Sequence, residues 1–164
     1  MGHMTTAPDW RPVLAPRGQY SALVRVGSSP ARVAHGNGGR LAFVAAPYIE
    51  AVHDRRGWRP DLSVRLSLLT GREVMRLRMS GVTAVCPSLM LGAMCEASHL
   101  VPDAPAPSDR RGWEEWARPI LFAAGQIVVP DIDGWHRCPL IWRQVQWALG
   151  RNVPVHVYAG GLPS

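Results

Sequence analysis

The sequence predicts an α/β protein with a three-layer, Rossmann-like fold, in which helices cover both faces of a parallel sheet of four to five strands. Short apolar runs of the kind that form buried strands alternate with longer stretches of helical periodicity. Proline or glycine closes each apolar run, which limits the strands to a few residues. Because crossovers between such strands are right-handed, consecutive strands lie parallel with their helices on either face.

The expected elements follow from these patterns. Strands are expected over residues 20–26, 40–48, 82–87, 126–132 and 153–159. Helices are expected over residues 61–80, 88–100, 110–124 and 139–150. Asp61 and Asp109 stand where N-caps are needed, and Pro139 suits a first helical turn. Gly71 interrupts the first of these helices and is a place where it could split, while the Gly, Ser and Pro content of residues 27–40 predicts a loop.

The chain of 164 residues is expected to form one domain, because that length is usual for a single core. We place the domain at residues 41–164 and interpret residues 1–40 as an irregular N-terminal arm rich in Pro, Arg and Gly. In the opening "MGHM", residues 1–3 are interpreted as a cloning remnant ahead of a native Met4.

The formal net charge of +6 comes from arginine, since the sequence contains no lysine. The arginines are spread along the whole chain, which favours a solvated surface over a nucleic-acid-binding face. We therefore expect no nucleic-acid partner. A small anionic ligand such as a nucleotide fits this charge equally well, because arginine can bind phosphate with two parallel hydrogen bonds.

The cysteines argue against a metal centre and against a disulfide framework. Cys86, Cys95 and Cys138 show neither CxxC spacing nor paired histidines, and their number is odd. We expect no metal and no cofactor. No apolar run approaches the roughly 18 residues of a membrane span, so the expectation is a cytoplasmic protein without a membrane partner.

The predicted sheet places a ligand site at the carboxyl ends of its strands, where α/β proteins bind their ligands. Three loops leave strands at that edge and should surround one crevice. They contain Pro47–Tyr48, Pro87–Ser88 and Asp131–Cys138.

Several motifs on these elements occur together in one known family. "LAFVAAPY", "MSGVTAVCPS", "WEEW" and "VPDIDGWHRCPLIWRQVQWALGRNVPVHVY" follow one another between about residues 41 and 158. In this order they resemble the nucleoside 2-deoxyribosyltransferase superfamily, and in particular its small bacterial and phage proteins. The resemblance implies cleavage or exchange of the N-glycosidic bond of a nucleoside or nucleotide. In that family a helix glutamate attacks the anomeric carbon or supports the attack of water.

The sequence departs from the family at the catalytic helix. Gln144 stands where the family has its glutamate, Cys138 where it has a serine, and Leu140 where it has a glycine. A neutral amide cannot form a glycosyl ester and stabilises an oxocarbenium-like centre poorly. Three hypotheses remain open: a glycosidase or transferase that uses another group, a silent nucleotide-binding or regulatory module, and a biosynthetic enzyme with diverged chemistry on a related ligand.

The candidate site residues follow from the loops and the resemblance. Gln144, Asp131, Asp133 and Cys138 are the candidates for catalysis, and a thiol at a helix N-terminus is expected to have a lowered pKa. The candidates for ligand binding are Tyr48, Pro47, Arg65, Ser88 and Trp135. Structural explanations compete with these roles: Asp133 suits a turn before Gly134, Trp135 could cover the sheet, Cys138 could be passive, and Arg65 could be solvated.

The resemblance also implies assembly, because relatives often complete one another's sites across a dimer interface. We therefore expect a homo-oligomer, with tryptophans such as Trp142 and Trp147 available for the contact. The expected small-molecule partner is a nucleoside or nucleotide.

Overall fold

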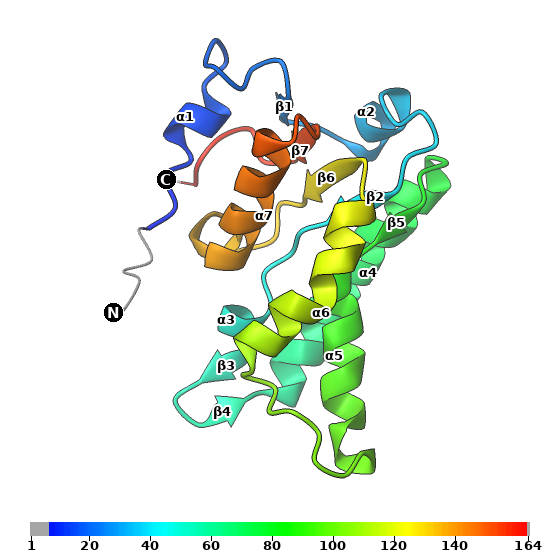
Figure 1. Ribbon diagram of the computed structural model, residues 1–164, viewed down its shortest axis with the longest axis vertical. Helices are drawn as coiled ribbons and strands as arrows, with labels where there is room; N and C mark the ends of the chain where they lie inside the picture. The colour runs from blue at the N-terminus through cyan, green and yellow to red at the C-terminus, as the bar shows by residue number, and fades with distance from the viewer. Residues whose placement is uncertain (1–6, 164) are drawn as a thin grey trace.

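The computed structural model describes residues 7–163 and contains a parallel sheet of five strands, which confirms the predicted fold class (Figure 1). The strands lie in the order β1-β7-β6-β2-β5. Their bounds are Val24–Val26 (β1), Ala42–Val44 (β2), Ala84–Val85 (β5), Gln126–Val129 (β6) and Val155–Val157 (β7). The predicted cloning remnant lies outside the described residues.

Helices surround this sheet, and α4, α5 and α6 extend well beyond the strands (Figure 1). Their bounds are Arg11–Leu14 (α1), Pro30–His35 (α2), Ile49–Val52 (α3), Pro60–Met79 (α4), Pro87–Ala97 (α5), Arg110–Ala123 (α6) and Pro139–Gly150 (α7). Short 3-10 turns cover Ser98–Leu100 and Trp135–Arg137. None of the helices described between residues 7 and 163 is both long and apolar enough to cross a membrane.

Two apolar cores pack on opposite faces of the sheet, because successive side chains of a strand point to opposite sides. Phe43 and Ala45 point into one core together with the buried stripe of α7, whereas Val44 and Ala46 point into the other with α2 and α4. The helix α6 contributes to both cores. The molecule therefore has the three layers that the sequence predicted.

Local sequence features determine where the helices nearest the candidate site begin and end. Asp109 caps α6, since its carboxylate accepts a hydrogen bond from the backbone N–H of Gly112 at 3.1 Å. The helix α7 begins at Pro139 and ends at Gly150, as predicted. The helix α4 runs through Gly71 without a break.

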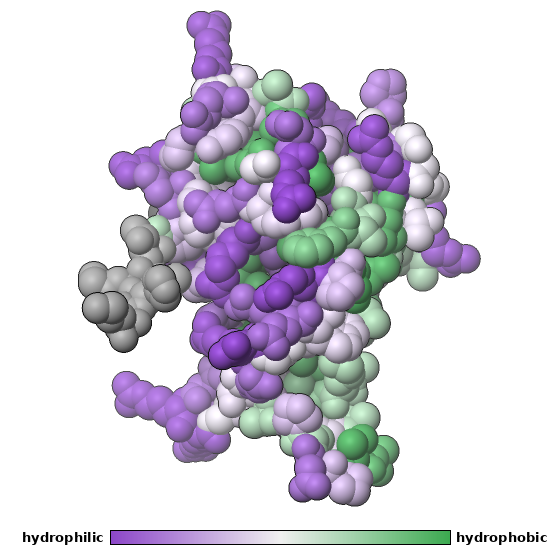
Figure 2. All heavy atoms as spheres, in the orientation of Figure 1, coloured by the Kyte–Doolittle hydropathy of each residue, from purple (hydrophilic) through white to green (hydrophobic). Residues whose placement is uncertain are grey.

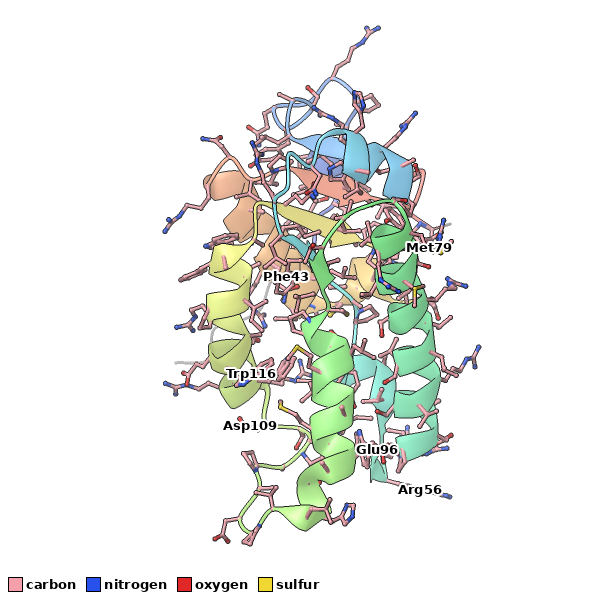
Figure 3. All side chains as sticks on the ribbon, turned by 90° about the vertical axis from the view of Figure 1, so that its right-hand side faces the viewer. Phe43, Arg56, Met79, Glu96, Asp109 and Trp116 are labelled. Carbon is pink, nitrogen blue, oxygen red and sulfur yellow. The ribbon has the colours of Figure 1, made fainter. Side chains whose placement is uncertain are left out.

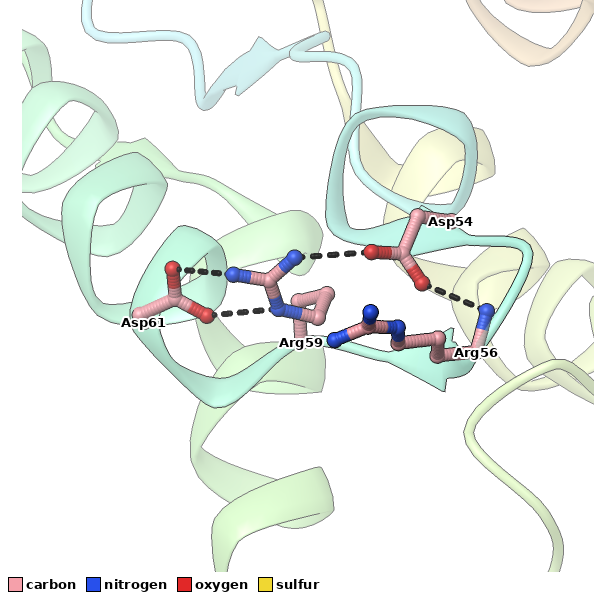
Figure 4. A network of polar contacts seen from close by, with 4 residues as sticks. All are labelled: Asp54, Arg56, Arg59 and Asp61. Carbon is pink, nitrogen blue, oxygen red and sulfur yellow. Dashed lines mark hydrogen bonds and ion pairs between the residues drawn. The ribbon is translucent and has the colours of Figure 1, made fainter.

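A small hairpin of β3 (His53–Asp54) and β4 (Gly57–Trp58) leads into α4. At this point Arg59 forms ion pairs with Asp54 at 2.7 Å and with Asp61 at 2.9 Å (Figure 4). Asp61 thus does not cap α4 as expected. Arg59 is the N-cap, and Asp61 lies in the first turn, where a negative charge also suits the helix dipole.

Two expectations for the N-terminal part were wrong. The predicted loop contains α2, because Ser29 accepts a hydrogen bond from the backbone N–H of Arg32 and Pro30 fits the first helical turn. The predicted irregular arm contains β1, which confirms a strand within residues 20–26 and pairs in parallel with β7 at the edge of the sheet. In the same segment Trp10 is 2% exposed, and its Nε1 donates a hydrogen bond to the carbonyl of His136 at 2.7 Å. Residues 7–39 are therefore part of the domain.

Candidate functional site

The strand order reverses between β2 and β6, because the chain moves from β2 outward to β5 and then returns to β6. Such a switch point opens a crevice outside the carboxyl ends of the strands. Hydrogen bonds connect the segment directly after β2 with β6 and with α5. The N–H of Ala45 donates to the carbonyl of Val128 at 2.8 Å, and Ser88 Oγ donates to the carbonyl of Ala46 at 2.8 Å.

Several residues predicted to bind ligand are buried in this framework. Tyr48 is 1% exposed, and its hydroxyl is already engaged by Ser63 Oγ at 2.7 Å and by the Nε1 donor of Trp58 at 3.3 Å. Pro47 is buried beside it. Trp135 packs edge-to-face on Trp10 with ring centroids 4.8 Å apart. These side chains belong to the packed interior, and Trp135 covers the sheet, which was the structural alternative.

The charged candidates lie at the surface. Asp131 and Arg65 are exposed, so both can reach solvent. The side chain of Asp133 is 99% exposed and lies 3.9 Å from Arg137. The residue that follows it, Gly134, has φ 85°, which a tight turn requires and glycine adopts without strain. The geometry thus fits the alternative in which Asp133 belongs to a turn before Gly134.

The pKa of the Cys138 thiol differs from the one that the sequence predicted. The residue is buried at the start of α7, and burial raises the pKa of its thiol to about 11, with the nearby Glu50 carboxylate adding to the shift. The backbone amides of Leu140 and Ile141 act in the opposite direction but are outweighed. The predicted lowering of this pKa was wrong, and a thiol that stays protonated near neutral pH is a poor nucleophile.

Gln144 lies on α7 and lines a cavity, on the side of the helix that the sequence periodicity predicted. Ile141 and Val145 are buried in the core on the sheet, and Gln144 points between α7 and α6. Only 8% of its surface is exposed, and its Oε1 finds no hydrogen-bond partner within residues 7–163. A buried acceptor left unpaired costs roughly 1–3 kcal/mol, so this atom is suited to a ligand donor.

We call the surrounding cavity, of about 190 Å³, the α6–α7 groove. Its lining comprises Phe43, Glu114, Ala117, Arg118, Leu121, Phe122, Leu140, Arg143, Gln144 and Trp147. Typical ligand pockets hold about 300–1,000 Å³. The groove is therefore smaller than a typical ligand pocket and has room for a group about the size of a sugar ring.

The sequence reasoning missed the charges of this groove. Glu114 of α6 forms an ion pair with Arg143 of α7, and Arg118 lies one turn after Glu114 on the same helix. The groove thus contains one carboxylate and two guanidinium groups beside the Gln144 amide. The signal in the sequence was the i,i+4 spacing of Glu114 and Arg118 directly after Trp113, but nothing local indicates which helix they face.

Glu50 was also missed. It lies on α3, directly after the β2 loop, where its Oε1 pairs with Arg110 of α6 and its Oε2 accepts from Cys138 Sγ at 3.8 Å. This carboxylate connects the ends of β2 and β6 with the first turn of α6. Two partly exposed ion pairs, Glu50–Arg110 and Glu114–Arg143, thus connect α6 with α3 and with α7.

Another cavity, of about 430 Å³, lies between α5, α6 and the loop that joins them. Its lining is mainly apolar and includes Trp113 and Trp116, whose stacked rings lie 4.8 Å apart. Figure 3 shows Trp116 on α6 facing α5, and Figure 2 shows apolar side chains gathered over these helices at the lower right. None of the predicted site residues lines this cavity, so we place the candidate site in the α6–α7 groove.

The fold is a parallel α/β domain with a groove of mixed polar and apolar lining between α6 and α7, beside Phe43 of β2. The sequence matches the family described as "Domain of unknown function (DUF1937)" over residues 40–160, and the chain belongs to that family. Comparison with curated proteins found no match. Comparison with solved structures found none either.

Proposed function

We propose that this protein binds a nucleoside or nucleotide in the α6–α7 groove and acts on its N-glycosidic bond, as the likeness to the nucleoside 2-deoxyribosyltransferase superfamily suggested. The observation that carries the proposal is Gln144, whose buried Oε1 has no partner in the described part of the chain and borders the cavity. A sugar hydroxyl is a donor of the right size for this acceptor. Arg118 and Arg143 favour a ligand that carries phosphate.

Glu114 supplies the negative charge that position 144 lacks. Its carboxylate lines the same groove, so it lies beside a sugar hydrogen-bonded to Gln144. In hydrolysis, water forms a bond to the anomeric carbon while the bond from that carbon to the base nitrogen breaks. Glu114 takes the proton from water, and the leaving base acquires one from solvent. A carboxylate near this centre also stabilises its oxocarbenium-like charge.

One observation favours a silent nucleotide-binding module as a second candidate. Glu114 is paired with Arg143, and a paired carboxylate is a weaker base and a weaker stabiliser of positive charge than a free one. With a neutral amide at position 144, such a groove would bind its ligand without turnover. The two candidates share the site and differ only in the release of free base.

The binding site is tested by calorimetry with a panel of nucleosides and nucleotides, comparing Gln144→Ala with Gln146→Ala. Gln146 lies on the same helix but is exposed, so it controls for the substitution itself. Loss of the one hydrogen bond at Gln144 should weaken binding roughly tenfold, about 1.4 kcal/mol. Gln146→Ala should bind as the parent does. Equal affinities for all three proteins would place the site elsewhere, and the absence of any binding ligand would reject the proposal.

A further inference from the structure

A second cavity lies outside the proposed site, between α5, α6 and the loop that joins them, and we call it the α5–α6 cavity. Its volume of about 430 Å³ falls within the range of about 300–1,000 Å³ that is typical of small-molecule pockets. Most of the side chains around it are apolar, and Asp109 is the one charged residue among the described residues that line it. An apolar cavity with a single charged group suits a small molecule that is itself apolar apart from one charge.

The loop forms one wall of this cavity without filling it. Ala104 and Ala106 contribute small side chains to the wall, and Pro105 and Pro107 contribute rigid ones. In the part of the chain that the structure describes, the backbone hydrogen bonds of residues 101–108 reach no further than three positions along the chain. The side chains around the empty space lack packing contacts on one side, and a bound ligand would restore them.

The α6 wall of the cavity is aromatic. Trp113 and Trp116 line it with rings that are stacked 4.8 Å apart. Trp113 is buried, whereas 40% of Trp116 is exposed beside α5 (Figure 3). Met94 of α5 also lines the cavity, and its thioether can adapt to the shape of a ligand. Because the face of an indole ring attracts cations, this wall favours a ligand with a positive charge next to its apolar part.

The segment around the cavity is acidic, in contrast to the rest of the chain. The protein has a formal net charge of +6, yet residues 79–109 contain neither arginine nor lysine. The same segment contains three carboxylates, those of Glu96, Asp103 and Asp109. It includes α5 and the whole loop, so it forms most of the surroundings of the cavity. The local charge thus complements a cation and opposes an anion.

The charge of Asp109 is available to a ligand. Its Oδ1 accepts a hydrogen bond from the N–H of Gly112 at 3.1 Å, and within residues 7–163 the carboxylate forms no ion pair. The two arginines that follow it are paired with other acids, Arg110 with Glu50 and Arg111 with Glu115. An ammonium group beside Asp109 would therefore gain a charge-assisted hydrogen bond without displacing an existing cation.

We propose that the α5–α6 cavity binds a small apolar cation, an ammonium group joined to an aromatic or aliphatic body. The body lies against the tryptophan pair and the loop, and the ammonium group hydrogen-bonds Asp109. A phosphate or carboxylate ligand would meet the charge of Asp109 and would find no arginine among the described residues that line the cavity. A nucleotide therefore fits this cavity poorly, and the inference is independent of the function proposed for the α6–α7 groove.

Calorimetry of the full chain near neutral pH, with three probes of similar size, tests the class of ligand. The probes are 4-phenylbutylamine, which is protonated, 4-phenylbutanol, which is neutral, and 4-phenylbutanoate, which is an anion. We expect one amine to bind per chain and the alcohol to bind roughly tenfold more weakly, because the alcohol lacks the ion pair and the cation–π contact. The carboxylate should bind more weakly still. Equal affinities for the three probes, or no binding of the amine, would overturn the proposal.

The Asp109→Asn variant isolates the charge, because asparagine caps a helix as well as aspartate does and keeps α6 in place. This variant should bind the amine no more tightly than the alcohol. Glu96→Gln is the matched control, since Glu96 does not line the cavity and Figure 3 shows it on the far side of α5 from Asp109. It should keep the affinity for the amine to within roughly twofold, because exposed charges at a distance are screened. A preference for the amine that survives Asp109→Asn would reject the proposal.

Filling the cavity tests where the amine binds. Ala104→Trp adds a large ring at a residue of the loop that lines the cavity, and it should abolish binding of 4-phenylbutylamine. Ala93→Trp adds the same ring to an exposed residue of α5 outside the lining and should bind as the parent does. Thermal unfolding checks that both variants are folded. Unchanged binding by folded Ala104→Trp would place the amine elsewhere and overturn the proposal.

Discussion

Gln144 is buried, polar and unpaired among the residues that the structure describes, and each of these properties has a cost. An apolar residue of similar size would remove that cost without disturbing α7. The groove beside it contains Arg118, Arg143 and Glu114 among apolar side chains, so the amide shares its cavity with three charged groups. This combination is what we expect of a residue retained for a ligand.

Converting the amide to a carboxylate is the sharpest test of chemistry. Gln144→Glu should raise the release of free base from a bound nucleoside or nucleotide, followed by mass spectrometry. A carboxylate at this position stabilises positive charge at the anomeric carbon, and about 1.4–2.7 kcal/mol of added stabilisation corresponds to a ten- to hundredfold faster reaction. Gln146→Glu adds the same charge outside the groove and should leave the rate unchanged. A parent protein that already turns over rapidly and is slowed by Gln144→Glu would show that another group has taken over catalysis.

At the scale of elements, helix ends and helical faces could be predicted because neighbouring residues determine them. Asp109 was predicted to cap α6, and it does. The helical periodicity that buries Ile141 and Val145 against the sheet also predicted that Gln144 lies on the side of α7 that faces the groove. The helix α2 was missed because its Gly and Ser neighbours resemble a loop. The Glu114–Arg143 pair could not be predicted, since it depends on how two helices meet. The same is true of the burial that sets the pKa of Cys138.

A buried histidine lies on β7, the strand next to the edge strand β1, and its protonation should affect stability. His156 of β7 hydrogen-bonds Ser28 Oγ through Nδ1 at 2.9 Å, and burial, with a smaller contribution from Arg25, lowers its pKa to about 4. The unfolded chain takes up this proton near pH 6.5, while the folded chain does so only near pH 4. The stabilisation is therefore complete above about pH 6.5 and is lost as the pH falls toward 4, by up to roughly 3 kcal/mol.

This dependence is measured by urea unfolding between pH 4 and 7.5. Carboxylates also titrate in this range, so the comparison is with His156→Gln, which cannot take up the proton. The parent should lose more unfolding free energy than His156→Gln over the interval, with the difference concentrated between pH 4 and 6.5. Parallel curves for the two proteins would show that His156 titrates alike in both states.

On the scale of the whole molecule, the folded domain begins earlier in the chain than the family match does. The match begins at residue 40, yet β1 extends the sheet beyond β7 and Trp10 packs on Trp135 in the loop that precedes α7. Val33 of α2 is fully buried in the core on the opposite face. Residues 7–39 thus support both cores and the loop that precedes α7.

A chain that begins at residue 40 should therefore fail to fold cooperatively, although it keeps every residue matched by the family. Replacing a buried tryptophan by alanine alone costs about 3–5 kcal/mol, and removal of the segment also deletes β1 and α2. A typical domain has only about 5–15 kcal/mol in total. Thermal unfolding followed by circular dichroism should show a sharp transition for a chain beginning at residue 7 and none for the shorter one. The Trp10→Ala variant of the full chain should still unfold in one transition, at a lower temperature than the parent. If the chain beginning at residue 40 melted at the same temperature as the parent, the N-terminal segment would be an accessory to the domain.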